Sequence, residues 1–239
     1  MANPKLFRII DHGISEYSMI EDGDRILIGA SGGKDSTALV EYFGSRLLRL
    51  ARNGGPSFSV TALHIAADFG SPFPGELVHR FKKWGVPLEH LKVPVLARLK
   101  PGHSMNCWWC STQRRSELNE YAIREGYNKI ALGHHLDDIL ETLLMNALTK
   151  GELSTMPPRL KYEKYPVTVI RPLCFADIPM IVAHATKGSY ISSTCTCDYQ
   201  DNSGRKTARG KLEALTGGNY KEKIKLFQAL RNVKTDYLP

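Results

Sequence analysis

A run of glycines, serines and one lysine at positions 31–36 is the first part of the sequence suited to chemistry. It reads Ser-Gly-Gly-Lys-Asp-Ser and lies between an apolar stretch and a segment of helical periodicity. Glycines let the backbone bring its amides close to an anion, and a helix start adds N–H donors and the positive end of a dipole. The run therefore predicts a phosphate-binding loop formed by Ser31, Gly32, Gly33, Lys34, Asp35 and Ser36.

This loop is not a Walker A loop, because the pattern G-x-x-x-x-G-K-[ST] does not occur in the chain. Asp35 would also repel a terminal phosphate unless a cation lay between them. The simpler alternative is an ordinary strand-to-helix turn in which Asp35 and Ser36 cap the helix.

A second group of polar residues lies at positions 133–142, where Gly-His-His-Leu-Asp-Asp follows an apolar stretch and opens a helix. In an open α/β sheet ligands bind at the carboxyl ends of the strands, so this turn should face the same crevice as the phosphate loop. Asp137 and Asp138 would complement the helix dipole, or they would position Mg²⁺ or steer a proton. His135 suits a structural role as well as a catalytic one.

The five cysteines are odd in number and unevenly placed. Two form a C-x-x-C pair around Trp108 and Trp109, which would pack locally, shield a metal site or stack on a base. Two more form a C-x-C pair, and such pairs in a reducing compartment indicate a redox site, a four-thiolate zinc site or an iron–sulfur cluster. Cys174 lies in an apolar stretch and is expected to be a buried hydrophobic residue. The two pairs are Cys107 with Cys110 and Cys195 with Cys197.

The composition indicates a soluble globular protein of 239 residues with 42% hydrophobic residues and a net charge of 32 − 24 = +8. The sequence pI is about 9.2, and the C-terminal third is rich in lysine and arginine, which permits a nucleic-acid partner. The chain has neither a membrane-length apolar stretch nor a secretory signal. We therefore expect a cytoplasmic protein.

Apolar strands alternate with helices along the chain, which predicts an α/β fold with a doubly wound parallel sheet. We expect one domain over 1–239, with a core at about 20–185 and a cysteine-bearing loop and basic helices at 186–239. Residues 94–112 are expected to be irregular. The expected strands are 25–30, 59–65, 88–93, 129–133 and 168–173, and the expected helices are about 4–20, 36–50, 75–85, 112–126, 136–149 and 205–232.

Residues 31–36 resemble the S-G-G-x-D-S signature of the PP-loop ATP pyrophosphatases, whose fold is adenine nucleotide alpha hydrolase-like. Residues 133–142 resemble the G-H-x-x-D-D-x-x-x-T element of the tRNA-thiolating branch, and the likeness continues at 156–158 and 170–173. It covers about residues 25–232 and points to the TtcA/TtuA type and its U34-thiolating relatives. The resemblance implies that the loop holds the pyrophosphate of ATP and that AMP is formed.

The cysteine pairs also resemble that branch, because Cys110 continues as C-x-x-x-R-R and Cys197 begins C-x-Y-x-x-N-x-x-R. The resemblance implies that Cys107, Cys110 and Cys197 hold a [4Fe-4S] cluster whose fourth iron binds the sulfur to be transferred. Cys195 departs from the pattern, and would be the third ligand, a fourth ligand or a persulfide carrier. Arg114 would neutralise cluster charge or contact phosphate, although an exposed helical arginine is the simpler reading.

The expected activity is ATP-dependent 2-thiolation of a pyrimidine in tRNA, in which adenylation turns the 2-oxygen into a leaving group. The expected cofactors are ATP, Mg²⁺ and the cluster. Asp35, Asp137, Asp138 and Arg114 are assigned to catalysis, and nucleotide binding is assigned to the loop residues 31–36 with His64, Gly133 and His135.

The expected partners are tRNA and a sulfur donor, which is a cysteine desulfurase, a sulfur carrier or inorganic sulfide, and a homodimer is possible. One alternative keeps the chemistry on another substrate or in the desulfurising direction. A second alternative is a zinc-stabilised RNA- or nucleotide-binding protein without turnover.

Overall fold

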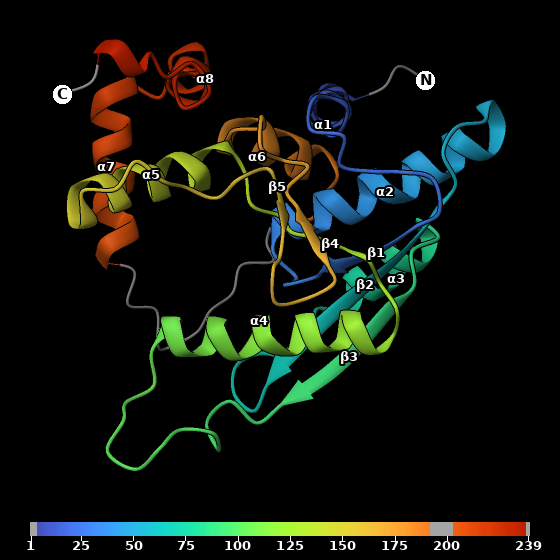
Figure 1. The fold of residues 1–239 in the computed structure, drawn as a ribbon. Helices are drawn as coiled ribbons and strands as arrows, with labels where there is room; N and C mark the ends of the chain where they lie inside the picture. The colour runs from blue at the N-terminus through green and yellow to red at the C-terminus, as the bar shows by residue number, and fades with distance from the viewer. Residues whose placement is uncertain (1–3, 192–202, 238–239) are drawn as a thin grey trace.

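A six-stranded sheet forms the centre of the computed structural model, which describes residues 4–191 and 203–237 (Figure 1). The strand order is β3-β2-β1-β4-β6-β5, and every neighbouring pair is parallel except β5 with β6. The strands are β1 (Asp24–Gly29), β2 (Phe58–Ala67), β3 (Leu88–Val93), β4 (Lys129–Ala131), β5 (Arg159–Lys161) and β6 (Thr168–Ile170).

Helices cover both faces of the sheet, which confirms the predicted doubly wound α/β fold. The helices are α1 (Lys5–Glu16), α2 (Lys34–Asn53), α3 (Gly75–Lys83), α4 (Cys107–Arg124), α5 (Leu136–Lys150), α6 (Ile178–Lys187), α7 (Ser203–Thr216) and α8 (Tyr220–Ala229), followed by a short 3₁₀ turn, Thr235–Tyr237. No helix in the described ranges is both long enough and apolar enough to cross a membrane.

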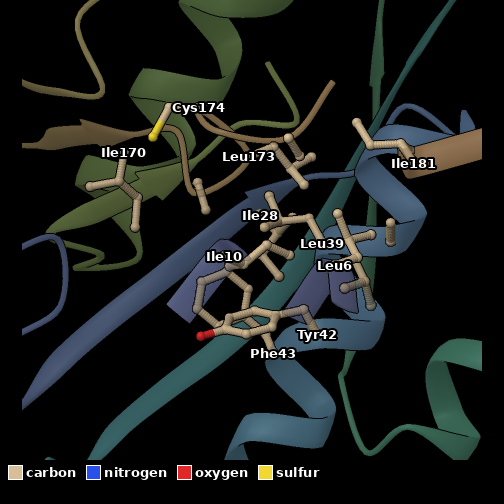
Figure 2. Close-up of a cluster of buried hydrophobic side chains, with 14 of the residues drawn as sticks. Leu6, Ile10, Ile28, Leu39, Tyr42, Phe43, Ile170, Leu173, Cys174 and Ile181 are labelled. Atoms are coloured by element: carbon tan, nitrogen blue, oxygen red, sulfur yellow. The ribbon is translucent and has the colours of Figure 1, made fainter. Parts of the chain in front are cut away.

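Successive residues of β1 point to opposite faces and enter two separate cores, as expected for a strand buried on both sides. Ile26 and Ile28 join a large core with α1, α2, α5 and α6, whereas Leu27 joins a smaller core beneath α4. Figure 2 shows part of the larger core, where Leu39 and Phe43 of α2 meet Ile28. Burial of these side chains fixes α2 against β1.

The first cysteine pair lies on a helix, so the prediction of an irregular segment up to residue 112 was wrong. Helix α4 begins at Cys107, five residues earlier than expected, because the side chain of Asn106 caps it. The Asn106 Oδ1 atom accepts a hydrogen bond of 2.9 Å from the backbone N–H of Trp109. Such a side-chain cap satisfies a donor that a helix start otherwise leaves without a partner.

Two elements were not predicted, and two predicted strands were too long, since the strand expected over 129–133 ends at Ala131. The antiparallel β5 and the helix α6 were absent from the expected order. The strand expected over 168–173 ends at Ile170, so Cys174 lies in the turn after it. Its side chain is fully buried, which confirms the expected hydrophobic role.

Candidate functional site

A cavity of about 470 Å³ opens where the strand order changes direction between β1 and β4. Ligands of open α/β sheets bind at such a position, beyond the carboxyl ends of the strands. Three segments supply the polar lining of the cavity: the phosphate loop with the start of α2, the β4–α5 turn with the start of α5, and the helix α7. Their polar residues at the cavity are Ser31, Lys34, Asp35, Ser36, His134, His135, Asp138, Arg205 and Arg209.

The phosphate loop is closed by a ring of hydrogen bonds among its own residues. The Gly33 N–H donates to Ser31 Oγ at 3.3 Å, and the Ser36 hydroxyl donates to the Gly33 carbonyl oxygen at 3.1 Å. The two serine hydroxyls are 3.1 Å apart. Gly32 has a φ of +85°, which favours glycine at this point of the loop.

Helix α2 begins with its first backbone donors uncapped by a side chain. Its N-cap is Gly33, and Asp35 and Ser36 lie inside the first turn. The alternative in which Asp35 and Ser36 cap the helix is therefore wrong. The first N–H groups of α2 and its positive dipole end remain suited to an anion.

Gly133 allows the β4–α5 turn to lie directly against the phosphate loop. A Cβ atom built on Gly133 would lie 3.0 Å from the Ser36 nitrogen and 3.2 Å from the Asp35 carbonyl carbon. Both neighbours are backbone atoms, so neither can give way without moving the loop. The absence of a side chain at Gly133 therefore sets the distance between the two walls of the site.

His135 brings the carboxylates of Asp35 and Asp138 toward one another. Its Nδ1 accepts from the Asp138 N–H at 3.3 Å, and Asp138 Oδ2 accepts from the His135 N–H at 3.1 Å. The His135 Nε2 atom lies 3.3 Å from Asp138 Oδ2 and 3.9 Å from Asp35 Oδ1. This capping box makes His135 structural while it orients Asp138.

The two carboxylate oxygens of Asp35 differ in their surroundings. Its Oδ2 accepts from Lys34 Nζ at 3.1 Å. Its Oδ1 is buried and has no hydrogen-bond partner in the part of the chain that the structure describes. A buried carboxylate oxygen without a hydrogen-bond donor is suited to bind a cation.

Asp137 points away from the cavity, although it is adjacent to Asp138 in the sequence. Its Oδ1 accepts from Lys223 Nζ at 2.7 Å, and its Oδ2 accepts from the Ile178 N–H at 2.8 Å. Asp137 and Lys223 are both buried. The structure thus places the predicted catalytic residue Asp137 in a contact between helices and only Asp138 at the cavity.

His134 joins two distant segments at the cavity. Arg171 Nε donates to His134 Nδ1 at 3.3 Å, and Arg171 Nη1 donates to the Pro157 carbonyl oxygen at 2.6 Å. Burial, and after it the neighbouring Arg171 guanidinium, lowers the pKa of His134 to about 4. His134 is therefore neutral near pH 7, with Nε2 as its N–H donor.

The arginines of α7 complete the cavity and were not assigned to the site from the sequence. Arg205 Nη1 lies 3.4 Å from Asp138 Oδ1, and Arg209 Nε lies 2.8 Å from Glu141 Oε1. The signal that could have found them lies after Cys197, where Arg205 ends the C-x-Y-x-x-N-x-x-R motif and Ala208-Arg209 follows it. His134 was missed beside His135, although it occupies the histidine position of the G-H-x-x-D-D element.

His64 and two of the loop glycines lie outside the lining of this cavity. The His64 ring nitrogen Nδ1 is 2.9 Å from the Ala30 carbonyl oxygen, just after β1. Burial is the largest cause of the lowered pKa of His64. His64 thus anchors the chain that enters the phosphate loop, and Gly32 and Gly33 belong to the loop without lining the cavity.

Cys107 and Cys110 are one helical turn apart at the start of α4, and both are half-buried. Residues at this spacing share a face of the helix, and the N-terminal end of a helix favours negative ligands such as thiolates. Arg114 follows Cys110 by a further turn. These residues fit part of a site in which thiolates hold an iron–sulfur cluster. Cys195 and Cys197 lie outside the described residues.

The two tryptophans of the first cysteine pair have different surroundings. Trp109 packs on the core beneath α4, and its indole N–H donates to the Val95 carbonyl oxygen at 3.2 Å. Trp108 is 72% exposed. Cys174 is excluded from this group because burial raises the pKa of its thiol to about 12 and it lies in the other core.

Residues 6–190 match the family of the PP-loop domain. A tRNA-cytidine(32) 2-sulfurtransferase of Anaeromyxobacter sp. (strain Fw109-5) is 37% identical, with 98% of this chain and 77% of the relative aligned. The enzyme of the same name from Alkalilimnicola ehrlichii (strain ATCC BAA-1101 / DSM 17681 / MLHE-1) is 33% identical, with 98% of this chain and 74% of the relative aligned.

Solved structures share the fold at low sequence identity. The U34-tRNA thiolase NcsA from Methanococcus maripaludis, solved with its [4Fe-4S] cluster, has a TM-score of 0.74 and 19% identity, with 98% of this chain and 79% of that chain covered. An NMN synthetase from Francisella tularensis has a TM-score of 0.55 and 13% identity, with coverages of 100% and 99%. The matched domain and the curated relatives together show that the chain belongs to the PP-loop family, among the tRNA-cytidine(32) 2-sulfurtransferases.

Proposed function

We propose that this protein uses ATP to replace the 2-oxygen of cytidine 32 in tRNA with sulfur. The observation that carries the proposal is the cavity between β1 and β4. It combines an uncapped helix start, the phosphate loop and the carboxylates of Asp35 and Asp138. The position and base are taken from the names of the curated relatives, which align with nearly the whole chain.

The phosphate loop binds the pyrophosphate part of ATP. The first N–H groups of α2 donate to phosphate oxygens, and Lys34 supplies a positive charge. The Ser31 and Ser36 hydroxyls hold the loop in shape. Gly133 keeps the opposite wall close enough for both walls to contact one ligand.

Asp35 and Asp138 would hold Mg²⁺ beside the phosphates. The buried Oδ1 of Asp35 has no hydrogen-bond partner among residues 4–191 and 203–237. It lies 3.9 Å from His135 Nε2, and Asp138 Oδ2 approaches the same imidazole. Oxygen ligands from one or two carboxylates, together with substrate phosphates, are typical of Mg²⁺ sites. Asp137 takes no part in this because it does not line the cavity, and its oxygens bind Lys223 and the Ile178 N–H instead.

The reaction proceeds in two displacements. The 2-oxygen of cytidine attacks the α-phosphorus, so an O–P bond forms, the α–β bond breaks and pyrophosphate leaves. Sulfide then bonds to C2 while the C2–O bond breaks and AMP leaves with the oxygen, so no oxidant or reductant is needed. His134 is neutral and lines the cavity, so it is suited to donate its Nε2–H to an oxygen of the reacting groups.

Cys107, Cys110 and Cys197 would hold a [4Fe-4S] cluster, which supplies an iron that binds the sulfur to be transferred. Among the described residues, the thiolate donors fit such a cluster, because Cys107 and Cys110 share one face of α4. Arg114 follows on that face and would balance negative charge.

The remaining partners and the setting are part of the same proposal. Sulfur comes from a cysteine desulfurase, a sulfur carrier or inorganic sulfide. The protein acts on tRNA in the cytoplasm, as a monomer or as a homodimer. We also propose one domain over 1–239, which is supported by the packing of α7 and α8 on α5.

The test is thiolation of a defined tRNA by anaerobically purified protein. With ATP, Mg²⁺ and sulfide, nucleoside mass spectrometry should detect 2-thiocytidine from a transcript with cytidine 32 and none from a matched transcript with uridine 32. About four irons per chain should accompany activity. Stoichiometric zinc without iron, and no thionucleoside from either transcript, would overturn the proposal in favour of a binding protein without turnover.

A further inference from the structure

Helix α5 carries a buried carboxylate that the proposed reaction does not use. The side chain of Glu141 is 2% exposed, and it lies one turn beyond Asp138 on the same helix. Its Oε1 accepts a 2.8 Å hydrogen bond from Arg209 Nε of α7. Its Oε2 is buried and has no hydrogen-bond partner among the described residues.

A charge buried with one partner is costly, so the position of Glu141 calls for an explanation. Removing a carboxylate from water costs several kcal/mol, and a single ion pair offsets this only in part. A hydrophobic residue would join α5 to α7 at lower cost. Glu141 does one thing that such a residue does not: it holds the guanidinium of Arg209 by a charged hydrogen bond.

Arg209 is held at the cavity with donors left for a ligand. Its side chain is 60% exposed although Glu141 is buried, and it lines the cavity together with the phosphate loop. Among residues 4–191 and 203–237, the bond to Glu141 uses Nε, so the two terminal nitrogens of the fork can still donate. A guanidinium in this state matches the oxygens of a phosphate group.

We propose that Arg209 binds the phosphate chain of the nucleoside triphosphate and that Glu141 is its positioning residue. The inference rests on the proposed use of ATP at this cavity. Arg209 then contacts the triphosphate from α7 while the phosphate loop contacts it from α2. Arg205 has a different partner from Arg209. It contacts Asp138, which lies at the cavity itself and would contribute to the cation site.

The test measures the affinity of the purified protein for ATP with Mg²⁺ and, separately, for AMP, by titration calorimetry. Arg209→Gln keeps a donor for Glu141 but removes the positive charge. It should weaken ATP binding about 10- to 100-fold, because a charged hydrogen bond contributes about 1.5–3 kcal/mol, and it should weaken AMP binding less. Lys211→Ala removes one positive charge from the same helix outside the cavity lining and should leave both affinities unchanged.

A double-mutant cycle separates positioning from simple packing. Glu141→Gln should weaken ATP binding in the wild-type background and have no further effect in the Arg209→Gln background. If Glu141 only joins two helices, the melting temperature will fall while the ATP affinity of the folded protein stays the same, and the inference fails. The Glu141→Gln/Arg209→Gln protein contains no buried unpaired charge, so it provides a folded reference.

The outcomes also distinguish this inference from the proposed function. Wild-type protein that binds no ATP contradicts the proposed function itself. Wild-type protein that binds ATP, with Arg209→Gln binding it equally well, leaves the proposed function standing and overturns the role of Arg209. Equal losses of ATP and AMP affinity in Arg209→Gln would also overturn it, because the contact would not be to the phosphate chain.

Discussion

Lys223 of α8 donates a 2.7 Å hydrogen bond to Asp137 of α5, and both side chains are buried. The second oxygen of Asp137 accepts the backbone N–H of Ile178 at the start of α6. One carboxylate therefore joins three helices. Its neighbour Asp138 faces the cavity, so two adjacent acidic residues have separate tasks.

Loss of Lys223 should destabilise the protein without altering the nucleotide site. Lys223→Met leaves Asp137 buried without its cation, which should lower the free energy of unfolding by about 3–5 kcal/mol. The double variant Asp137→Asn/Lys223→Met removes both charges and should recover most of this loss. Urea denaturation measures the effect, and an unchanged unfolding free energy in Lys223→Met would contradict the structural role of Asp137.

Gly133→Ala should abolish tight ATP binding. The added methyl carbon would lie 3.0 Å from the Ser36 nitrogen, so the phosphate loop must move. The matched control is Gly210→Ala on α7, where nothing lies within 4 Å of the new carbon. That control should keep its ATP affinity and gain about 0.5–1 kcal/mol of stability, because alanine favours a helix. Equal ATP affinity in both variants would show that the close approach is unimportant.

The phosphate loop could be predicted because its chemistry is local. Six consecutive residues follow a buried strand and precede a helix, so spacing alone brings the donors together. The parallel sheet followed from the alternation of apolar strands and helices in the same way. The short β5 could not be predicted because it has only three residues and forms the edge of the sheet, so its sequence carries almost no periodic signal.

The separate tasks of Asp137 and Asp138 could not be predicted. Adjacent helical residues point about 100° apart, and which one faces the cavity depends on how α5 is rotated. That rotation is set by packing, and Lys223, 86 positions away, then selects Asp137. Arg209 lies 68 positions from Glu141, so their contact required the tertiary structure as well.

Asp138→Asn should lower the rate of pyrophosphate release by about 100-fold or more while the protein stays folded. Asparagine keeps an oxygen that accepts from the His135 N–H, so the capping box survives. It removes the charge that would hold Mg²⁺, a contribution of several kcal/mol to the transition state. A pyrophosphate assay measures the rates of the wild type and the variant, and equal melting temperatures show that both proteins are folded. An active Asp138→Asn enzyme would remove this carboxylate from the cation site.

Cys107→Ala and Cys110→Ala should each lose iron, acid-labile sulfide and thiolation together. The control is Cys174→Ala, which changes a thiol buried in the opposite core and should retain iron. Iron analysis of anaerobically purified variants makes the comparison without an activity assay. Full iron in Cys107→Ala would show that the C-x-x-C pair is not part of the ligand set.

The low pKa of His134 predicts a dependence of stability on pH. Burial and the adjacent Arg171 lower this pKa to about 4 in the folded protein, against about 6.5 for an unperturbed histidine. Between these values the unfolded chain binds the proton that the folded chain excludes, so the contribution to stability is complete above about pH 6.5 and is lost as pH falls through about 4.

His134→Gln tests this because the amide oxygen can still accept from Arg171 Nε, whereas the side chain cannot titrate. Unfolding free energies from urea titrations at pH 4.5 and 6.5 should therefore change less with pH in the variant than in the wild type. Carboxylates titrate over the same range in both proteins, so only the difference between them reports on His134. A midpoint near 6.5 for His134 in a histidine NMR titration would contradict its low pKa, and with it the expected difference between the two proteins.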